Sequence, residues 1–156
     1  MSVQTEITRK SSKAAAPREV VIRGDAKGFT QEIIVGLHRL VADEPKDVGG
    51  DDEGPAPYDL LLAALGSCTL MTATLYARRK GWPLQGVTAR LRHSRIHATD
   101  CVECETKEGK IERIELDIEF AGPLGSEQRS KLLEIAKKCP VHRTLTSETN
   151  IRARAA

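Results

Sequence analysis

Aromatic residues are scarce in this chain of 156 residues, at 3% of the sequence. Trp occurs once, and Tyr and Phe occur twice each, so a hydrophobic core must be built mainly from aliphatic side chains. An excess of basic charge is also lacking, because 24 Lys and Arg residues face 22 Asp and Glu residues. Domains that bind nucleic acid usually cluster Lys and Arg on one face. We therefore expect no nucleic-acid partner.

The N-terminus lacks the apolar run of a secretory signal peptide, since it reads M-S-V-Q-T-E-I-T-R-K. We therefore expect a cytoplasmic protein in a reducing compartment. Four cysteines in such a compartment are more often catalytic, redox-active or metal-binding than part of a structural disulfide framework. We expect residues 1–16 to be a disordered tail and residues 17–156 to form a single domain.

The most apolar stretch, Tyr58–Lys80, predicts a long buried helix at the centre of the fold. Pro57 precedes it and Gly81 follows it, which is the typical order of helix start and stop residues. A membrane span is the competing interpretation, but Gly66 and several Ser and Thr residues dilute the apolar run. The other segments are typical of a soluble domain. We therefore predict a core helix with Cys68 near its middle, and no membrane partner.

Short alternating segments on both sides of this helix predict antiparallel strands. The expected strands are residues 17–23, 29–41, 83–98, 110–120 and 144–153. A second helix is expected over 126–138, an acidic and solvated loop over 42–57, and a bulge between Ile111 and Ile114. Because strands and helices do not alternate regularly, we predict an α+β fold with antiparallel sheets wrapped around the long central helix.

Cys68 and Cys139 come together if the two predicted helices pack against each other. One hypothesis is a redox pair, in which one thiol is oxidised to a sulfenic acid and the other condenses with it. The alternative is two small buried hydrophobic side chains. A buried thiol needs a nearby cation to ionise. The candidate cations are Arg23, His38, Arg39 and Arg143. Cys139 is expected at the negative end of its helix, which disfavours a thiolate, so we predict Cys68 as the attacking thiol.

Cys101 and Cys104 form a C-x2-C motif between two predicted strands, shortly after His93 and His97. One His, both cysteines and a further ligand would make a zinc site. The two His side chains lie ~13 Å apart on an extended strand, which is too far to share one metal. The pair is alternatively a second redox couple, or two exposed thiols in a hairpin loop. The sequence leaves these three interpretations open.

The segment P-Y-D-L-L-L-A-A-L-G-S-C-T-L-M, followed far downstream by K-C-P-V-H, resembles the OsmC/Ohr family over residues 29–151. This family comprises osmotically inducible and organic hydroperoxide resistance proteins. The resemblance implies an intertwined homodimer that reduces organic hydroperoxides with no metal or organic cofactor. It also implies that Cys68 is the reactive thiol and Cys139 the resolving thiol. A dithiol reductant is then expected to reset the pair.

The chain departs from the peroxidases of this family at two places. They carry a Glu directly after the Pro that precedes the helix, where this chain has Tyr58, with Asp59 one residue later. They also carry an activating Arg near the first hairpin turn, where Arg23 or Lys27 would have to substitute. The segments G-L-H-R-L-V-A-D-E-P and K-C-P-V-H-R-T-L indicate a distinct, OsmC-like branch.

Two functions therefore follow from the sequence. The first is a thiol peroxidase that reduces organic hydroperoxides. The second is a protein of the same fold that binds a small apolar or electrophilic ligand near Cys68, without peroxidase activity. His142, three residues after Cys139, either tunes that thiol or serves to cap and pack its own segment.

Overall fold

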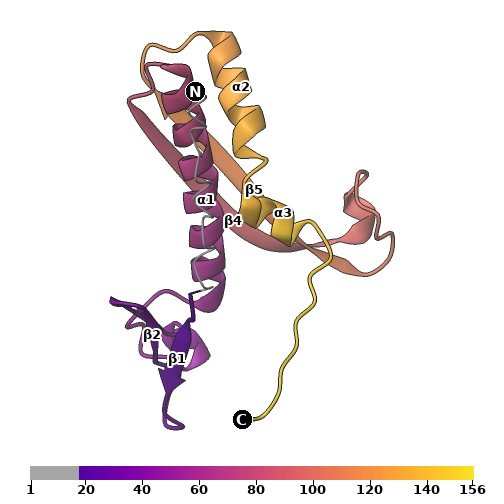
Figure 1. The fold of residues 1–156 in the computed structure, drawn as a ribbon. Helices are drawn as coiled ribbons and strands as arrows, with labels where there is room; N and C mark the ends of the chain where they lie inside the picture. The colour runs from indigo at the N-terminus through magenta and orange to yellow at the C-terminus, as the bar shows by residue number, and fades with distance from the viewer. Residues whose placement is uncertain (1–17) are drawn as a thin grey trace, which may run out of the picture. The chain divides into compact units, whose positions relative to one another are not determined.

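The computed structural model describes residues 18–156, so the predicted tail over residues 1–16 lies outside the described residues. The chain divides between Pro55 and Ala56 into two compact units (Figure 1), and each is described by itself. The single domain over residues 17–156 stays a prediction.

The N-terminal unit is a three-stranded antiparallel sheet in sequence order. Its strands are β1 (Val21–Gly24), β2 (Gln31–Val35) and β3 (His38–Ala42). The prediction of one continuous strand over residues 29–41 is wrong. Val35 pairs with His38, and Gly36 adopts a positive φ of 59° in the two-residue turn between them. Glycine favours this conformation because it has no Cβ, so Gly36 divides the apolar run into two strands.

One acidic side chain of the loop after β3 is buried rather than solvated. Asp43 is only 2% exposed, and its carboxylate accepts four hydrogen bonds within this unit. The donors are Thr30 Oγ1 at 3.2 Å and the backbone N–H groups of Glu44, Asp51 and Glu53 at 2.8, 3.1 and 3.2 Å. The prediction of a uniformly solvated acidic loop is therefore wrong at Asp43, which holds the loop in shape.

We predict that Asp43 makes the N-terminal unit sensitive to acid. Burial raises the pKa of Asp43, but the four hydrogen bonds outweigh it and hold the pKa below its ordinary value of 3.8. The stabilisation is therefore complete above the unfolded pKa and is lost as the pH falls through the lower, folded pKa. Asp43→Asn should broaden or lose the backbone NMR signals of β2 at neutral pH, as acid does for the unchanged protein. Asp47→Asn, on an exposed side chain of the same loop, is the control and should change neither.

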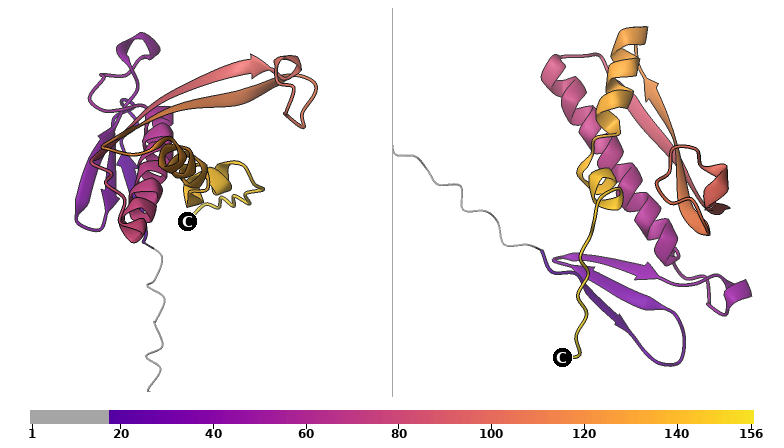
Figure 2. Two further views of the ribbon diagram at one scale, coloured as in Figure 1. Left: turned by 90° about the horizontal axis from the view of Figure 1, so that it is seen from above. Right: turned by 90° about the vertical axis from the view of Figure 1, so that its right-hand side faces the viewer.

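The C-terminal unit is built around the predicted long helix, which is confirmed as α1 (Pro57–Lys80). The other elements are β4 (Gly86–His97), β5 (Lys110–Ala121), α2 (Ser126–Ala136) and α3 (Pro140–Leu145). In residues 18–156, α1 alone is long and apolar enough to cross a membrane, and it is the core helix of this unit in contact with β4, α2 and α3. The β4–β5 hairpin extends past the helices at its tip (Figure 2).

A stripe of buried residues at every fourth position along α1 faces the rest of this unit. It consists of Leu65, Thr69, Ala73 and Ala77. Positions four apart lie on one face of a helix, and the small side chains let α2 and α3 approach closely. Gly66 beside this stripe has a similar role, because a Cβ there would lie 2.8 Å from Leu91 Cδ1 of β4. The core itself gathers at the C-terminal half of α1 around the fully buried Leu132 of α2.

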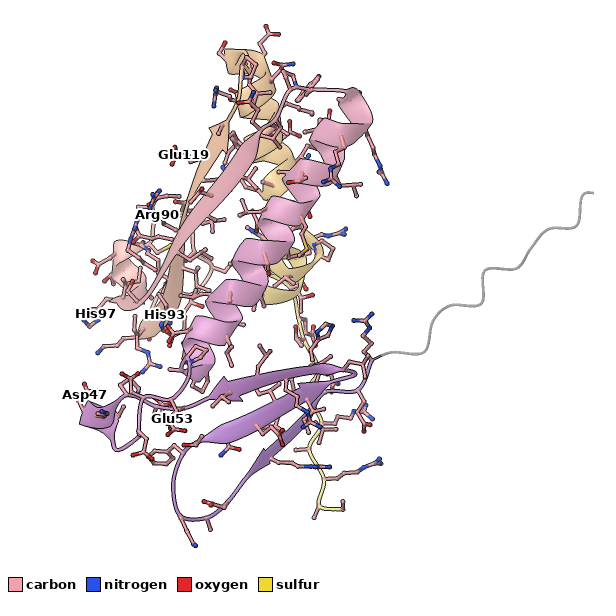
Figure 3. The ribbon with its side chains drawn as sticks, turned by 90° about the vertical axis from the view of Figure 1, so that its left-hand side faces the viewer. Asp47, Glu53, Arg90, His93, His97 and Glu119 are labelled. Carbon is pink, nitrogen blue, oxygen red and sulfur yellow. A yellow bond between two sulfur atoms is a disulfide. The ribbon has the colours of Figure 1, made fainter. Side chains whose placement is uncertain are left out.

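The two strands of the hairpin pair without interruption from Gly86↔Ala121 to His97↔Lys110. The predicted bulge between Ile111 and Ile114 is therefore wrong. Ile111 points to the opposite face from Ile114 because the residues are an odd number apart, and its cross-strand partner there is Ile96. The rest of that outer face is mainly polar and carries ion pairs, such as the 3.6 Å contact between Arg90 and Glu119 (Figure 3).

The predicted final strand over residues 144–153 is also wrong. The short helix α3 occupies Pro140–Leu145, and the remaining described residues form no strand. The second helix is predicted to end before Cys139 and Pro140, because Pro disfavours the helical conformation of the residue before it. Pro is, however, also favoured at the first position of a new helix. Both effects operate here, so α2 ends at Ala136 and α3 begins four residues later. Cys139 therefore lies at the start of α3 and not at the end of α2.

The side chain of Arg129 makes three hydrogen bonds to the backbone around the turn between β5 and α2. We predict that the protein loses stability when Arg129 is replaced by lysine. Arg129 donates from Nη1 to Phe120 O, from Nη2 to Gly122 O at 2.9 Å and from Nε to Leu124 O at 3.3 Å. Lysine cannot supply this planar set of donors. Arg129→Lys should therefore lower the free energy of unfolding by about 1–3 kcal/mol. Urea denaturation followed by Trp fluorescence measures this, with Arg79→Lys on the exposed end of α1 as the unaffected control.

Candidate functional site

Cys68 and Cys139 meet where α3 packs against the middle of α1. Cys139 is fully buried, and its sulfur lies 3.4 Å from Thr69 Oγ1 on the stripe of α1. The backbone N–H of His142 donates to the same sulfur at 3.3 Å. Cys68 precedes Thr69 on α1, is only half-buried, and contributes to lowering the pKa of Cys139. The two thiols that the sequence singled out therefore share one site.

The Cys139 thiol is surrounded by hydrogen-bond donors. Burial raises its pKa, but interactions with the Thr69 hydroxyl, the His142 N–H, the Cys68 thiol and the Val141 N–H outweigh burial and hold the pKa below its ordinary value of 9.0. The expectation that a helix end would disfavour a Cys139 thiolate is wrong. Cys139 is the N-cap of α3, so it faces unpaired N–H groups rather than carbonyls.

A largely apolar pocket of about 230 Å³ lies beside the segment that carries Cys139. Two of its lining residues also touch the site, because Leu65 O accepts from Thr69 Oγ1 at 2.8 Å and His142 donates to Cys139. The full lining is Leu65, Glu112, Ile114, Leu116, His142, Leu145 and Thr146. Hydrogen bonds from Arg95 and then His93 hold the pKa of Glu112 below its ordinary value, so the only carboxylate of this lining is ionised at neutral pH.

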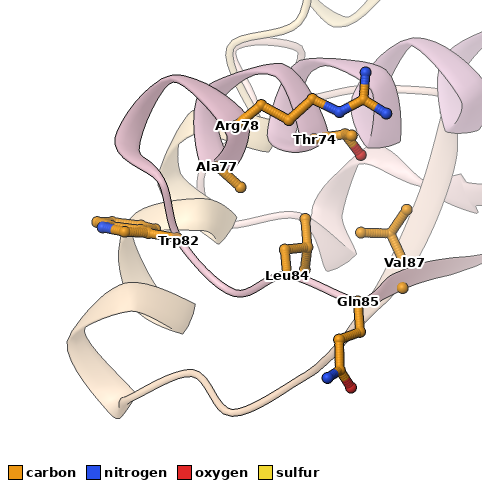
Figure 4. A pocket seen from close by; sticks show the side chains of 8 residues that line it. Thr74, Ala77, Arg78, Trp82, Leu84, Gln85 and Val87 are labelled. Carbon is orange, nitrogen blue, oxygen red and sulfur yellow. The ribbon is translucent and has the colours of Figure 1, made fainter.

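A second pocket, also of about 230 Å³, lies at the opposite end of α1 (Figure 4). It is lined by Thr74, Ala77, Arg78, Trp82, Leu84, Gln85, Gly86 and Val87. None of these residues hydrogen-bonds to Cys139, whereas His142 of the first pocket donates to its sulfur. The pocket beside Cys139 is therefore the better candidate for chemistry at sulfur.

Tyr58 and Asp59, which stand near the family's Glu position, have other contacts. Tyr58 stacks on His93 with ring centroids 4.3 Å apart. Asp59 Oδ2 accepts from the backbone N–H of Ala56 at 3.0 Å, at the third residue of α1, and so caps the helix. Neither side chain makes a hydrogen bond to Cys68 or Cys139 among the described residues.

The candidate cations Arg23, His38 and Arg39 all belong to the N-terminal unit. Within that unit Arg39 Nη1 contacts Glu32 Oε1 at 2.5 Å, and Arg23 lies opposite Glu32 in the strand register. Their activating role toward Cys68 stays a prediction. His142 acts on Cys139 through its backbone N–H, whereas its side chain lines the apolar pocket.

Cys101 and Cys104 form a disulfide at the hairpin tip, with their Cα atoms 5.4 Å apart. This arrangement agrees with the redox interpretation of the C-x2-C motif. His93, the first candidate zinc ligand, is engaged elsewhere, because its Nε2 lies 2.6 Å from Glu112 Oε2. Among residues 18–156 no group of three or more His, Cys, Asp and Glu side chains is placed to hold a metal ion.

Thr69 is the site residue that the sequence analysis missed. Its signal was the spacing of four residues from Leu65 and Ala73, which places a hydroxyl on the buried stripe of α1. A buried hydroxyl requires a partner, and here the partners are Leu65 O and Cys139 Sγ. The polar residue Thr69 on the apolar stripe of α1 therefore indicated that a polar partner packs there, and that partner is Cys139.

Several solved protein structures have a fold similar to that of this chain. An OsmC-like protein from Mycoplasma pneumoniae superposes with a TM-score of 0.66 at 22% identity, covering 84% of this chain and 88% of that one. An organic hydroperoxide resistance protein OsmC, a predicted redox protein from Legionella pneumophila, gives 0.63 at 19%, covering 86% and 92%. The organic hydroperoxide resistance protein OhrB of Bacillus subtilis gives 0.58 at 18%, covering 85% and 93%.

Curated protein sequences give no significant match. These structural likenesses confirm the predicted α+β fold with antiparallel sheets and a long helix. The model of the OsmC-like protein family matches residues 50–154, which include both thiols, the pocket and the hairpin. The chain therefore belongs to the OsmC-like family.

Proposed function

We propose that this protein is a thiol peroxidase that reduces organic hydroperoxides with Cys68 and Cys139. The observation that carries the proposal is the pairing of a half-buried thiol with a fully buried thiol of lowered pKa, beside an apolar pocket. The more accessible thiol, Cys68, would react with the peroxide, and the thiol of lowered pKa, Cys139, would form the disulfide. Similar structures described as organic hydroperoxide resistance proteins support the same chemistry.

The first step is attack by the Cys68 thiolate on the terminal oxygen of the hydroperoxide. The O–O bond breaks, the alkoxide leaves and takes a proton to become the alcohol, and Cys68 becomes a sulfenic acid. Cys68 suits this step because it is the more accessible of the two thiols. The apolar side chains of the adjoining pocket would hold the organic substituent, which favours organic hydroperoxides over hydrogen peroxide.

In the second step the Cys139 thiolate attacks the Cys68 sulfur. The S–O bond breaks, the hydroxide leaves as water with a proton, and a Cys68–Cys139 disulfide forms. The lowered pKa of Cys139 increases the fraction of thiolate at neutral pH. Burial of Cys139 keeps this thiolate away from the peroxide itself.

An external dithiol resets the pair. Its first thiolate attacks the accessible Cys68 sulfur and displaces Cys139, and its second thiolate then releases Cys68 and leaves the reductant as a disulfide. A thiol of low pKa is the better leaving group, so the surroundings of Cys139 favour this reduction as well.

The second candidate function is binding of a small apolar or electrophilic ligand on the same fold. The observation that favours it is the engagement of Asp59 as a helix cap and of Tyr58 in a stack with His93. Those contacts leave the thiols without the carboxylate that the peroxidases hold near the helix start. The pocket beside Cys139 would then hold a ligand without any turnover.

The decisive experiment is consumption of cumene hydroperoxide by the dithiol-reduced protein, with intact-mass analysis of the product. Turnover that ends in an intramolecular Cys68–Cys139 disulfide, located by peptide mapping, is the expected result. Protein-free reductant is the background control. Absence of turnover with both thiols intact would overturn the peroxidase and leave the binding protein.

We also predict a homodimer in solution. On α1, Met71 is 70% exposed and Leu75 is 50% exposed, so the other elements of the C-terminal unit leave apolar side chains of the core helix uncovered. Light scattering on a size-exclusion column should give twice the chain mass of 17.1 kDa. A mass equal to that of one chain would contradict the prediction.

A cytoplasmic location is likewise expected, because the free thiols Cys68 and Cys139 need a reducing compartment.

A further inference from the structure

The disulfide at the tip of the β4–β5 hairpin is a feature that the proposed peroxidase does not use. It joins Cys101 and Cys104 in the connection between the two strands, which extends past the helices (Figure 2). Val102 between the two cysteines is 92% exposed, and Glu103 is exposed as well. The bond thus lies on an outlying loop, and its two cysteines are half-buried beside these exposed residues.

This disulfide is expected to contribute little to the stability of the fold. It closes a ring across only two intervening residues, and the entropy that a cross-link removes from the unfolded chain grows with the length of the loop. The hairpin is already closed beneath it by the His97↔Lys110 pair and by the Ala98 N–H, which donates to Gly109 O at 2.8 Å. The fully buried Ala98 anchors the loop from below. These contacts at the base of the tip do not involve the S–S bond.

We propose that Cys101 and Cys104 are a second redox pair, which exchanges with external dithiols and disulfides independently of Cys68 and Cys139. A thiolate of an external dithiol attacks one sulfur of the Cys101–Cys104 bond and forms a mixed disulfide. Its second thiolate then displaces the protein sulfur, so the external dithiol leaves as a disulfide and both cysteines are left as thiols. An external disulfide reverses these steps. The proposal does not rest on peroxidase activity.

The charge of the tip selects its partners. From Ala98 to Lys110 inclusive, the chain carries four acidic residues, Asp100, Glu103, Glu105 and Glu108, against the two lysines Lys107 and Lys110. One lysine is tied to the backbone, since Lys107 Nζ donates to Cys104 O at 2.5 Å. A net negative tip repels anionic thiols and attracts cationic ones. The partner class is therefore a neutral or cationic dithiol, or a protein dithiol with a basic rim.

The test uses the full chain with Cys68→Ser and Cys139→Ser, so that only the tip cysteines react. The protein is equilibrated with reduced and oxidised dithiothreitol at a series of ratios, alkylated and weighed intact. We expect two thiols per chain to appear and disappear together and reversibly, with an unchanged circular dichroism spectrum. Reduction that requires unfolding, or thiols that do not re-form the bond, would overturn the proposal. One zinc per chain that blocks reoxidation would overturn it too, in favour of a metal site.

Partner selection has its own readout on the same variant after reduction. Cystamine, which is cationic, should oxidise the tip at least several-fold faster than anionic oxidised glutathione, and added salt should shrink the difference. Equal rates at low salt would refute the charge argument. If the double serine variant does not fold, peptide mapping of the unchanged protein reads the Cys101–Cys104 pair separately from Cys68 and Cys139.

Discussion

Cys68→Ser should reduce cumene hydroperoxide consumption to the rate of protein-free reductant, whereas Cys139→Ser should retain the first turnover. The difference follows from access, because Cys68 is half-buried and Cys139 is fully buried. A serine hydroxyl at position 68 cannot take the place of a thiolate at neutral pH. In Cys139→Ser the peroxide still oxidises Cys68 to a sulfenic acid, but no intramolecular disulfide can follow. Single-turnover assays with limiting peroxide separate the two variants.

Trapping of the sulfenic acid makes this prediction sharper. Dimedone should label Cys139→Ser after one equivalent of peroxide and should not label Cys68→Ser, as intact mass would show. Ser67→Ala, at the exposed position beside Cys68, is a matched control that should retain full turnover. Labelling of Cys139 in the Cys68→Ser variant would reverse the assigned roles.

Elements whose position follows from a single local sequence pattern were predictable. α1 begins at Pro57 and ends at Lys80 within one residue of the prediction, because Pro, Gly and an uninterrupted apolar run agree. The hairpin strands β4 and β5 were also predicted, since both alternate over many residues. Position 111 was misjudged because an apolar residue on the outer face has the same sequence pattern as a bulge.

Errors arose where one residue type carries two signals. Gly36 lies within an apolar run, and the pairing of Val35 with His38 and the positive φ of Gly36 show that the run is a hairpin. Pro140 both ends one helix and starts the next, and the choice between a strand and α3 depends on the packing of α3 against α1. Because α3 was not predicted, the surroundings of Cys139 were also predicted wrongly. Cys139 was expected at a helix C-terminus, whereas it caps a helix N-terminus, and the sign of the local field is opposite.

The thiols themselves were predictable, but their surroundings were not. The positions of Cys68 and Cys139 followed from the helices on which they lie and from the family resemblance. The pocket depends on the approach of Leu65, Leu116 and Leu145 from three different elements. Such tertiary contacts leave no periodic signal in the sequence. The same holds for the four hydrogen bonds to Asp43, whose donors are spread over more than twenty residues of chain.

Thr69→Val should slow closure of the Cys68–Cys139 disulfide roughly 10-fold to 100-fold at neutral pH, the range for loss of a hydrogen bond to a charged group. While Cys139 is a thiol, its S–H can donate to Thr69 Oγ1, and the hydroxyl donates to Leu65 O. Once Cys139 ionises, the hydroxyl can turn and donate to the sulfur. Valine has nearly the same shape but no donor, so the pKa of Cys139 should rise and the thiolate fraction should fall.

Stopped-flow measurement of disulfide closure against pH tests this prediction. In the unchanged protein the rate should reach half its maximum below the ordinary Cys pKa of 9.0, and in Thr69→Val the midpoint should move to higher pH. At pH values above both midpoints the two proteins should close at similar rates, because Cys139 is then ionised in each. Thr69→Ser retains the hydroxyl and should keep the original midpoint. A uniform slowing of Thr69→Val at every pH would mean that Thr69 positions α3 and has no part in the ionisation of Cys139.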